Sequence, residues 1–260
     1  MPCFSWKTIQ QRIKVNVEIK LINKGSSGFA FSCLKEDKSN PLNVTSEISR
    51  EYFKNEVGKS FSGYHLFIDN KISGHLYYSI SQNSILPFTA EDDVILIICT
   101  WILRKYRNMG LGKRLFERLK EDNKDMKGIV VRATTSPIFM YYTHFQRFGF
   151  RPVYQDKGYV YMYLPLKAEK VKVIIRKEKN INKEGIFILR NNFCPMIPFK
   201  VSEIKKIATE LSIHYEEVEI NHENIEKYGI DNGVFINGMK YPYNVGDRDL
   251  IKKVIDENLR

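Results

Sequence analysis

The stretch that decides the fold is Ile98-Cys99-Thr100-Trp101-Ile102-Leu103-Arg104-Lys105-Tyr106-Arg107-Asn108-Met109-Gly110-Leu111-Gly112-Lys113-Arg114-Leu115. It lies across an apolar run, 94–103, whose β-branched side chains predict a buried strand. It then enters a segment, 111–122, with apolar residues at helical spacing. Gly110 and Gly112 stand between the two, where a turn without side chains lets a ligand approach the backbone. The first N–H groups of the following helix are left unpaired, so the stretch predicts an anion-binding turn.

The turn has the pattern R-x-x-G-x-G, which runs from Arg107 to Gly112. The glycine spacing differs from the dinucleotide-binding fingerprint, and no acidic residue follows a second strand at the expected distance. The helix dipole and the basic residues Arg107, Lys113 and Arg114 favour a phosphate or pyrophosphate here. Taken alone, the hexamer is equally compatible with an ordinary strand–helix turn that carries solvated basic residues. The flanking segments therefore have to decide between the two interpretations.

Those segments give a regular order of elements. Ser136 and Pro137 have the form of a helix start, and Gly149 that of a helix end. Gly74, inside a strand pattern, permits a bulge or a close approach of another backbone. The expected elements are a strand at 15–22, a helix at 45–57, a hairpin at 64–80, strand 94–103, helix 111–122, a strand at 128–134, a helix at 136–148, and strands at 150–153 and 159–164.

This order, with the R-x-x-G-x-G turn and the ending Phe148-Gly149-Phe150, resembles the GNAT acetyltransferases over residues 15–166. The resemblance implies an α/β (α+β) acyl-CoA acyltransferase fold with a mixed central sheet and a V-shaped opening between two neighbouring strands. It implies acetyl-CoA as co-substrate, no metal, and direct attack by an amine in a ternary complex. In this family the backbone after the central strand pairs with the pantetheine arm, and the glycine turn holds the pyrophosphate. By position, the implied CoA-binding residues are Ile102, Leu103, Arg107, Asn108, Met109, Gly110, Leu111, Gly112 and Lys113.

The resemblance also exposes a departure at the expected proton donor. The family places a Tyr four residues before the Gly of Gly-Phe, and this chain has Phe145 there. Tyr141, one helical turn earlier, or the adjacent Tyr142 are the candidate replacements, and packing between helix and sheet is the alternative role for both. An alkyl ammonium must lose a proton before it attacks, so a base is expected as well. Asp93 is the candidate base, with a polar loop at the entrance of the strand as the alternative.

A second unit is expected after the polar segment Lys167-Ala168-Glu169-Lys170, which divides the chain into domains 1–168 and 171–260. The order of elements in this unit resembles a smaller thioredoxin-like α/β domain. It runs strand, Cys194-Pro195 at a helix start, strand, helix, hairpin and helix. A GNAT domain with this appendage resembles the acetyltransferases that carry a YoaP-like C-terminal domain. Ile197 stands where a C-x-x-C motif would have its second cysteine, so recognition or packing is favoured over dithiol redox chemistry.

Composition and charge limit the classes of partner that the chain is expected to bind. The net charge is +11, but residues 171–260 hold 15 Lys and Arg against 14 Asp and Glu, so the excess lies almost entirely in the first part. No zinc-finger spacing, basic helix or RNA-binding motif is present, so no nucleic-acid partner is expected. The four cysteines form no metal or disulfide pattern, and no apolar run is long enough to cross a bilayer. We expect a cytoplasmic protein without a membrane partner.

The leading hypothesis is an acetyl-CoA-dependent N-acetyltransferase that acts on a primary amine of a small molecule or peptide. Two alternatives stay open. Phe145 at the usual acid position suits a CoA-binding sensor with weak catalysis, and Cys194 at a helix start suits a thiol-dependent redox protein. The sequence determines neither the acceptor nor the oligomeric state.

Overall fold

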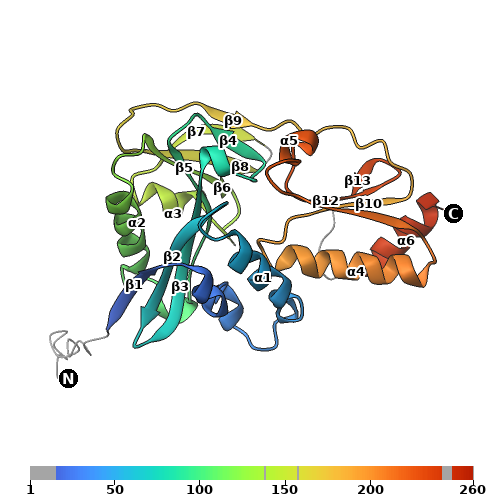
Figure 1. The fold of residues 1–260 in the computed structure, drawn as a ribbon, viewed down its shortest axis with the longest axis horizontal. Coiled ribbons are helices and arrows are strands. Elements are labelled where there is room, and N and C mark those ends of the chain that lie inside the picture. The colour runs from blue at the N-terminus through green and yellow to red at the C-terminus, as the bar shows by residue number, and fades with distance from the viewer. Residues whose placement is uncertain (1–15, 138, 157, 242–247, 260) are drawn as a thin grey trace, which may run out of the picture.

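A computed structural model describes residues 16–259 except 138, 157 and 242–247. Cys3 and the rest of the N-terminal segment lie outside this range. The chain forms two units side by side, a larger one built on a seven-stranded sheet and a smaller one built on a four-stranded sheet (Figure 1). No helix among the described residues is both long and apolar enough to cross a membrane.

The larger sheet has the strand order β1-β2-β3-β5-β6-β8-β7. Neighbouring strands in this sheet run antiparallel, except β5 and β6, which run parallel, so the sheet is mixed as expected. Its elements are β1 (Val17–Leu21), α1 (Ser46–Glu56), β2 (Ser62–Ile68), β3 (Lys71–Ile80), β5 (Val94–Ile102), α2 (Leu111–Asp122), β6 (Gly128–Thr134), α3 (Tyr142–Gln146), β7 (Arg151–Asp156) and β8 (Tyr159–Pro165).

Helices cover both faces of this sheet because its strands alternate apolar side chains between the two sides. On one side Leu111, Leu115 and Leu119 of α2 pack on the sheet in a single core. On the other side Phe53 of α1 packs on Tyr77 of β3 in an aromatic cluster. The sheet is thereby buried on both faces and holds the ends of its central strands in fixed positions.

The central strands separate part of the way along. β5 pairs with β6 only from Val94 to Ile97, although β5 continues to Ile102. The result is a V-shaped opening that begins at Ile98. The pairing of β5 with β3 shifts at the same place, because Tyr77 and Tyr78 face Cys99 and Ile97 and leave Ile98 as an extra, bulged residue. A bulge bends its strand and leaves backbone groups without a ladder partner.

Gly74 lies where β3 and β5 approach each other closely, as a glycine inside a strand pattern indicates. A Cβ atom built there would come within 2.7 Å of the carbonyl oxygen of Trp101 on β5. The neighbouring register shift, where Leu66 and Phe67 face Gly74 and Ile72, makes Ser73 a bulged residue of β3. Only glycine lets β3 and β5 pack this tightly at the last residues of β5.

The smaller sheet has the order β11-β10-β12-β13, with β10 parallel to β11 and antiparallel to β12. Its hairpin turns through Asn237 and Gly238, both with positive φ, as the Asn-Gly pattern predicts. The elements are β10 (Ile186–Arg190), α4 (Met196–Glu210), β11 (Tyr215–Glu219), α5 (Ile225–Tyr228), β12 (Gly233–Ile236), β13 (Met239–Tyr241) and α6 (Arg248–Leu259).

Two features join the units. β9 (Val173–Ile175) pairs with β4 (Phe88–Ala90) in a sheet of two strands, so residues 173–175 lie against the larger unit. The Phe193 ring, just before α4, enters the aromatic cluster of the larger unit, with ring centroids 5.0 Å from Phe61 and 5.7 Å from Tyr77. Figure 1 shows α1 and α4 meeting where the units join.

Candidate active site

The glycine turn links the end of β5 to the start of α2. Asn108 and Gly110 both have positive φ, at 63° and 75°, so the chain coils tightly before the helix begins at Leu111. The first intrahelical bond runs from the Arg114 amide to the Gly110 carbonyl, 3.2 Å. Within the described residues, no acceptor faces the N–H groups of residues 108–113. Unpaired amides in this arrangement form a concave set of donors that suits a phosphate.

A cavity of about 320 Å³ lies against this turn. Seven of the nine residues expected to bind CoA line it, and the basic side chains of Arg107 and Lys113 are among them. Leu103 and Met109 do not line it, since Leu103 is buried in the protein and Met109 is exposed away from the cavity. The seven are Ile102, Arg107, Asn108, Gly110, Leu111, Gly112 and Lys113.

Arg107 is held at the mouth of the cavity by its own chain. Its Nε donates to the carbonyl of Ile102 at 3.1 Å, and its guanidinium lies 4.7 Å from the Trp101 ring centre. The Trp101 indole N–H in turn donates to Glu36, which also accepts the Arg104 amide at 2.6 Å. Arg107 therefore caps the Ile102 carbonyl that the resemblance assigns to pantetheine, and a ligand would have to displace this contact.

Helix α3 differs from the expected helix. The sequence predicts a helix over 136–148, but the helix begins only at Tyr142, and Tyr141 is the residue that precedes it. The Thr134 hydroxyl donates to the Ser136 carbonyl at 2.8 Å, and the Thr134 amide donates to the Met140 carbonyl. These local bonds hold the preceding segment as a loop. Ile138, inside the expected helix, is not among the described residues.

The shorter helix separates the two candidate proton donors. Tyr141 lines the cavity beside the glycine turn. Tyr142 does not line it and packs against the core beneath α2. Phe145, at the position that usually holds the acid, also borders the cavity, but it is 2 % exposed and contacts Phe116 edge-on. Of the predicted pair, Tyr141 alone is brought together with the turn.

Asp93 lies at the other end of β5. It precedes Val94, and the four paired residues of β5 stand between it and the opening. Its carbonyl accepts the Lys127 amide at 2.8 Å. The neighbouring Glu91 pairs with Lys127 at 3.1 Å and accepts the Lys172 amide, which keeps the pKa of its carboxyl low. This acidic loop anchors the entrance of the strand and is not brought to the cavity.

The fold also assembles polar residues that the sequence does not bring together. His75 on β3 is fully buried, and its Nδ1 lies 2.7 Å from the Ser32 hydroxyl while its Nε2 lies 3.3 Å from the Cys99 sulfur. Burial lowers the pKa of His75 to about 3 and raises that of Cys99 well above its usual value. Both groups stay neutral beside the bulge. Cross-strand register creates this chain, and no spacing in the sequence shows it.

His144 is a further residue in the cavity wall. It packs edge-on against Tyr141, with ring centres 5.8 Å apart. Partial burial, together with Arg147 and Arg107, lowers its pKa. Among the described residues, no three His, Cys, Asp or Glu side chains are grouped so as to hold a metal ion.

Residues 31–150 match the family model described as "Acetyltransferase (GNAT) family". No curated protein matches the chain.

Three solved structures illustrate the similarity. The PaiA N-acetyltransferase of Thermoplasma acidophilum, in complex with coenzyme A, has 12% identity over 58% of this chain and 99% of its own, with a TM-score of 0.47. The ribosomal-protein-S18-alanine N-acetyltransferase of Escherichia coli has 14% identity over 60% and 97%, with a TM-score of 0.44. YhbS of Escherichia coli, a GNAT family N-acetyltransferase in complex with CoA, has 13% identity over 58% and 82%, with a TM-score of 0.41.

The matched segment contains the bulged strand, the glycine turn, the cavity and Tyr141. Residues 31–150 therefore resemble the acetyltransferases of the GNAT family.

Proposed function

We propose that the protein transfers the acetyl group of acetyl-CoA to a primary amine of a small molecule or peptide, by direct attack in a ternary complex. The observation that carries the proposal is the meeting of three features at one cavity. The free amides of the glycine turn, the end of β5 beyond its pairing with β6, and the Tyr141 side chain all border the same space.

Acetyl-CoA would lie along the opening. The amides of residues 108–112 would hold its pyrophosphate, with Arg107 and Lys113 adding positive charge. The pantetheine arm would pair with β5 beyond Ile98, where β6 no longer does. Holding both reactants in place supplies about 7–11 kcal/mol of the barrier reduction in well-aligned cases, so positioning is the main contribution of such a site.

The chemical step forms an N–C bond and breaks a C–S bond. The lone pair of the neutral amine attacks the thioester carbonyl, and the CoA thiolate leaves with the electron pair of the C–S bond. The nitrogen gives up its extra proton to water, and the thiolate takes a proton from a donor. We assign the donor role to Tyr141 because it lines the cavity, whereas Tyr142 packs in the core.

We further propose that residues 171–260 form a thioredoxin-like unit of the YoaP-like kind that shapes the acceptor side. The strand order β11-β10-β12-β13, with one parallel pair and two antiparallel pairs, supports this topology. Cys194 is exposed as a residue, but desolvation raises the pKa of its thiol above the usual value. A raised pKa disfavours the thiolate that redox chemistry needs, which supports a recognition role.

The experiment is a CoA-release assay over a panel of primary amines, together with calorimetric titration of acetyl-CoA. We expect binding, and release of CoA with at least one amine class. A second candidate, a CoA-binding sensor, is favoured by the buried Phe145 at the usual acid position. Tight binding without CoA release against the whole panel would establish the sensor instead, and absence of binding would refute both.

A further inference from the structure

One end of the smaller sheet faces the larger unit. Leu189 of β10 pairs with Gly233 of β12, so the residues that follow β10 and those that precede β12 lie at the same end of that sheet. Phe193, which follows β10, packs against Tyr77 of β3 in the aromatic cluster of the larger unit. The loop that precedes β12, residues 229–232, is therefore brought toward the larger sheet.

A second set of contacts fixes the position of this loop. The Tyr228 carbonyl accepts the Lys179 amide at 3.0 Å, and a Cβ atom built at Gly229 would collide with the carbonyl oxygen of Lys177. Both lysines follow β9, which pairs with β4 of the larger unit. The backbone of the loop is thus held against a segment that is itself part of the larger unit's surface.

Asp231 is the ionisable residue of this loop. Its side chain is partly buried and accepts the Asn232 amide at 3.0 Å. Among the residues that the structure describes, no Lys or Arg forms an ion pair with it. Desolvation raises the pKa of the Asp231 carboxyl above its usual value, although the charges of Arg132 on β6 and Lys240 on β13 act in the opposite direction.

The electrostatic neighbours of Asp231 lie where β5 and β6 separate. The pairing of β6 with β5 ends one residue before Arg132, and on β5 Cys99 follows the bulged residue Ile98. Besides desolvation, Cys194 raises the pKa of Cys99, and Asp231 in turn raises that of Cys194. Groups from both parting strands and from the smaller unit therefore lie near one another. We call them the apex cluster, which consists of Cys99, Arg132, Cys194 and Asp231.

The apex cluster keeps contact with solvent although protein surrounds it. Cys194 is exposed, and Cys99, Arg132 and Asp231 are partly exposed. Desolvation nevertheless raises the pKa of both thiols and of the Asp231 carboxyl. Ionisable groups that are desolvated and still accessible are typical of functional sites.

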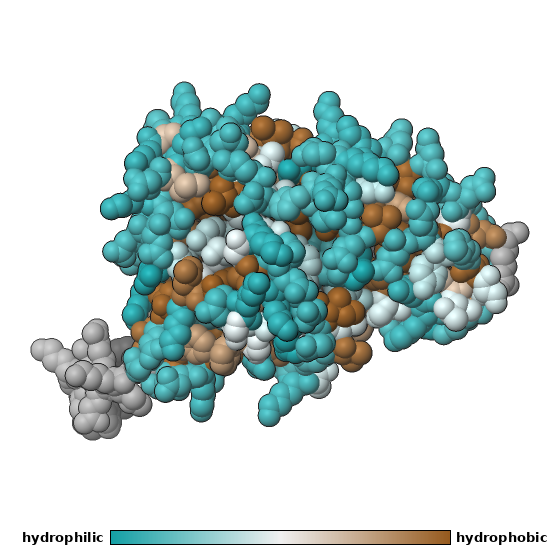
Figure 2. Space-filling model, viewed as in Figure 1, coloured by the Kyte–Doolittle hydropathy of each residue, from teal (hydrophilic) through white to brown (hydrophobic). Residues whose placement is uncertain are grey.

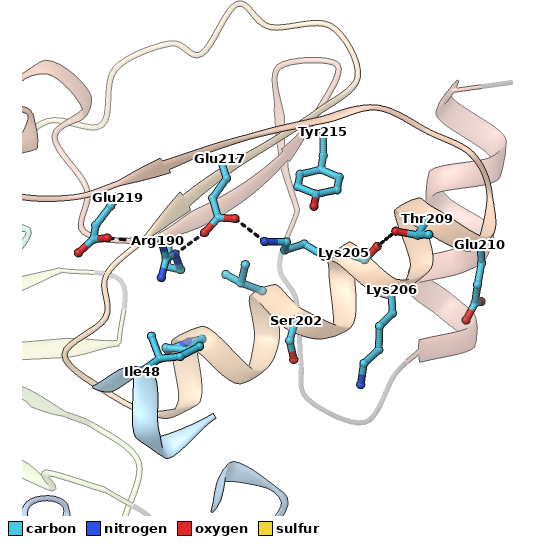
Figure 3. A pocket seen from close by; sticks show the side chains of 12 residues that line it. Ile48, Arg190, Ser202, Lys205, Lys206, Thr209, Glu210, Tyr215, Glu217 and Glu219 are labelled. Atoms are coloured by element: carbon cyan, nitrogen blue, oxygen red, sulfur yellow. Dashed lines mark hydrogen bonds and ion pairs between the residues drawn. The ribbon is translucent and has the colours of Figure 1, made fainter. Parts of the chain in front are cut away.

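Other carboxylates of the smaller unit are paired with basic residues. In a hollow of about 910 Å³ between α4 and β11, Glu217 bridges Arg190 and Lys205 (Figure 3). Arg190 also reaches Glu219 at 3.4 Å. Figure 2 shows hydrophilic residues over most of one face of the molecule, where water solvates charged groups. Asp231 differs from both kinds of carboxylate because it is desolvated without an ion pair.

The apex cluster is also placed near the reacting end of the donor. In the proposed mode of binding, the pyrophosphate lies at the glycine turn and the pantetheine arm runs back along β5. The thioester end of acetyl-CoA would therefore reach the residues next to Ile98, where the two strands meet. The smaller unit presents Asp231 to this point.

We propose that Asp231 is the general base of the acetyl transfer and that the smaller unit supplies it to the active site. The N–C bond forms as the C–S bond breaks, and the nitrogen then carries one extra proton. The water that takes this proton passes it to the Asp231 carboxylate, which becomes a neutral carboxylic acid and later releases the proton to solvent. The departing thiolate takes its own proton from Tyr141.

The proposal rests on the acetyltransferase function proposed above. It adds the residue that receives the proton and gives the smaller unit a part in the chemistry. Asp231 takes the role that the sequence assigns to Asp93, which lies at the opposite end of β5 from the glycine turn.

The test follows CoA release by the full-length protein with the best amine of the panel over a range of pH. A base must be ionised to accept a proton, so kcat of the wild type should fall as the pH falls through the pKa of Asp231. Asp231→Asn should lower kcat near pH 7 by about 10²-fold or more and abolish this fall. The KM for acetyl-CoA should stay unchanged, because the glycine turn is intact.

Arg132→Gln gives a second measurement that keeps the base. The positive charge of Arg132 favours the ionised carboxylate, so its removal raises the pKa of Asp231 and should move the fall in kcat to higher pH. A role of Asp231 in packing alone would leave the pH profile where it is. If Asp231→Asn does not fold, an unchanged profile in Arg132→Gln overturns the proposal.

Chemical rescue tests the carboxylate itself. Formate added to Asp231→Ala should restore part of the lost rate, since it supplies the missing base. Asp249→Asn is the matched control, because Asp249 is an exposed carboxylate at the start of α6 in the same unit. It should leave kcat and the pH profile unchanged.

Two outcomes would overturn the proposal, and they are distinguishable. Wild-type kcat and an unchanged pH profile in Asp231→Asn would show that the base lies elsewhere and would leave the acetyltransferase function standing. If the wild type releases no CoA with any amine, the proposed function fails and the assignment of the base fails with it.

Discussion

At the scale of single residues, Gly110 is the position on which ligand binding depends most directly. Its φ of 75° is left-handed, and a Cβ atom built there would have no heavy atom within 4 Å. Space in the protein is therefore not the constraint. The constraint is backbone strain, on the order of 1 kcal/mol, and the space that the phosphate needs beside the free amides.

We predict that Gly110→Ala lowers the affinity for acetyl-CoA by tenfold or more, as measured by calorimetry, with only about 1 kcal/mol lost in stability. Gly58→Ala is the matched control. Gly58 has a φ of 82° and equally open surroundings, but it lies outside the cavity. The control should lose similar stability and keep its affinity. Equal affinities in the two variants would mean that the turn does not bind CoA.

Tyr141 and its neighbour Tyr142 form a second matched pair. Removal of a general acid costs about 10²- to 10⁴-fold in rate, so Tyr141→Phe should lower kcat by a factor in that range with little change in the KM for acetyl-CoA. Tyr142→Phe removes the same hydroxyl from a residue that packs in the core and should leave kcat near wild type. Steady-state kinetics with the best amine of the panel would measure both. Similar effects of the two changes would contradict the assignment.

The sequence predicts the turn residues because glycines and basic residues at a strand–helix junction carry their own local signal. It does not separate Tyr141 from Tyr142, since that depends on where α3 begins. The Thr134 bonds to Ser136 and Met140 delay the helix, and nothing in the local pattern reveals them. His75, Ser32 and Cys99 come together through strand register alone.

At the scale of elements, strands β2 and β3 carry a directly paired set of buried histidines. His65 and His75 face each other across the two strands and are 1 % and 0 % exposed. Burial lowers the pKa of His65 to about 4 and that of His75 to about 3. Both groups titrate near 6.5 in the unfolded chain. Below that pH the unfolded state therefore binds more protons than the folded state, and stability falls as the pH falls.

We predict a loss on the order of 2 kcal/mol of unfolding free energy per histidine between about pH 7 and pH 5. Urea denaturation at the two pH values would measure it. His65→Gln should remove about half of this pH dependence, whatever it does to stability at neutral pH. A slope that is unchanged in the variant would show that His65 is not kept neutral by burial.

The sequence predicts the bounds of an element well where one apolar periodicity continues along the whole element. Helix α2 and strand β6 have the predicted bounds, Leu111–Asp122 and Gly128–Thr134. Strand β9 follows the predicted domain boundary at 168–171, but its partner is β4 in the larger unit. Pairing partners depend on which surfaces meet in the folded chain, and an alternating pattern does not encode that choice.

At the scale of the whole molecule, Phe193 and Arg176 hold the two units together. The Phe193 ring is 7 % exposed and packs among Phe31, Phe61 and Tyr77. The Arg176 guanidinium, also nearly buried, donates to the carbonyl of Leu86 at 2.6 Å and pairs with Glu226 on α5. Both contacts connect the unit that carries the glycine turn to the unit built on the four-stranded sheet.

We predict that Phe193→Ala costs about 3–5 kcal/mol and separates the two units, because it leaves a cavity in the aromatic cluster. Limited proteolysis should then cut the segment between β9 and β10, residues 176–185, much faster than in the wild type. Phe29→Ala removes a ring that is 45 % exposed and should change stability and proteolysis little. An intact cleavage pattern in Phe193→Ala would show that other contacts hold the units together.

The parting of β5 and β6 has a consequence for the energy of the whole protein. The sheet is incomplete there, with ladder positions that the chain does not fill from its own strands. A pantetheine arm in that place would act as a short borrowed strand, so occupancy and folding would be thermodynamically linked. The protein would then have a higher melting temperature with acetyl-CoA bound than after the release of CoA.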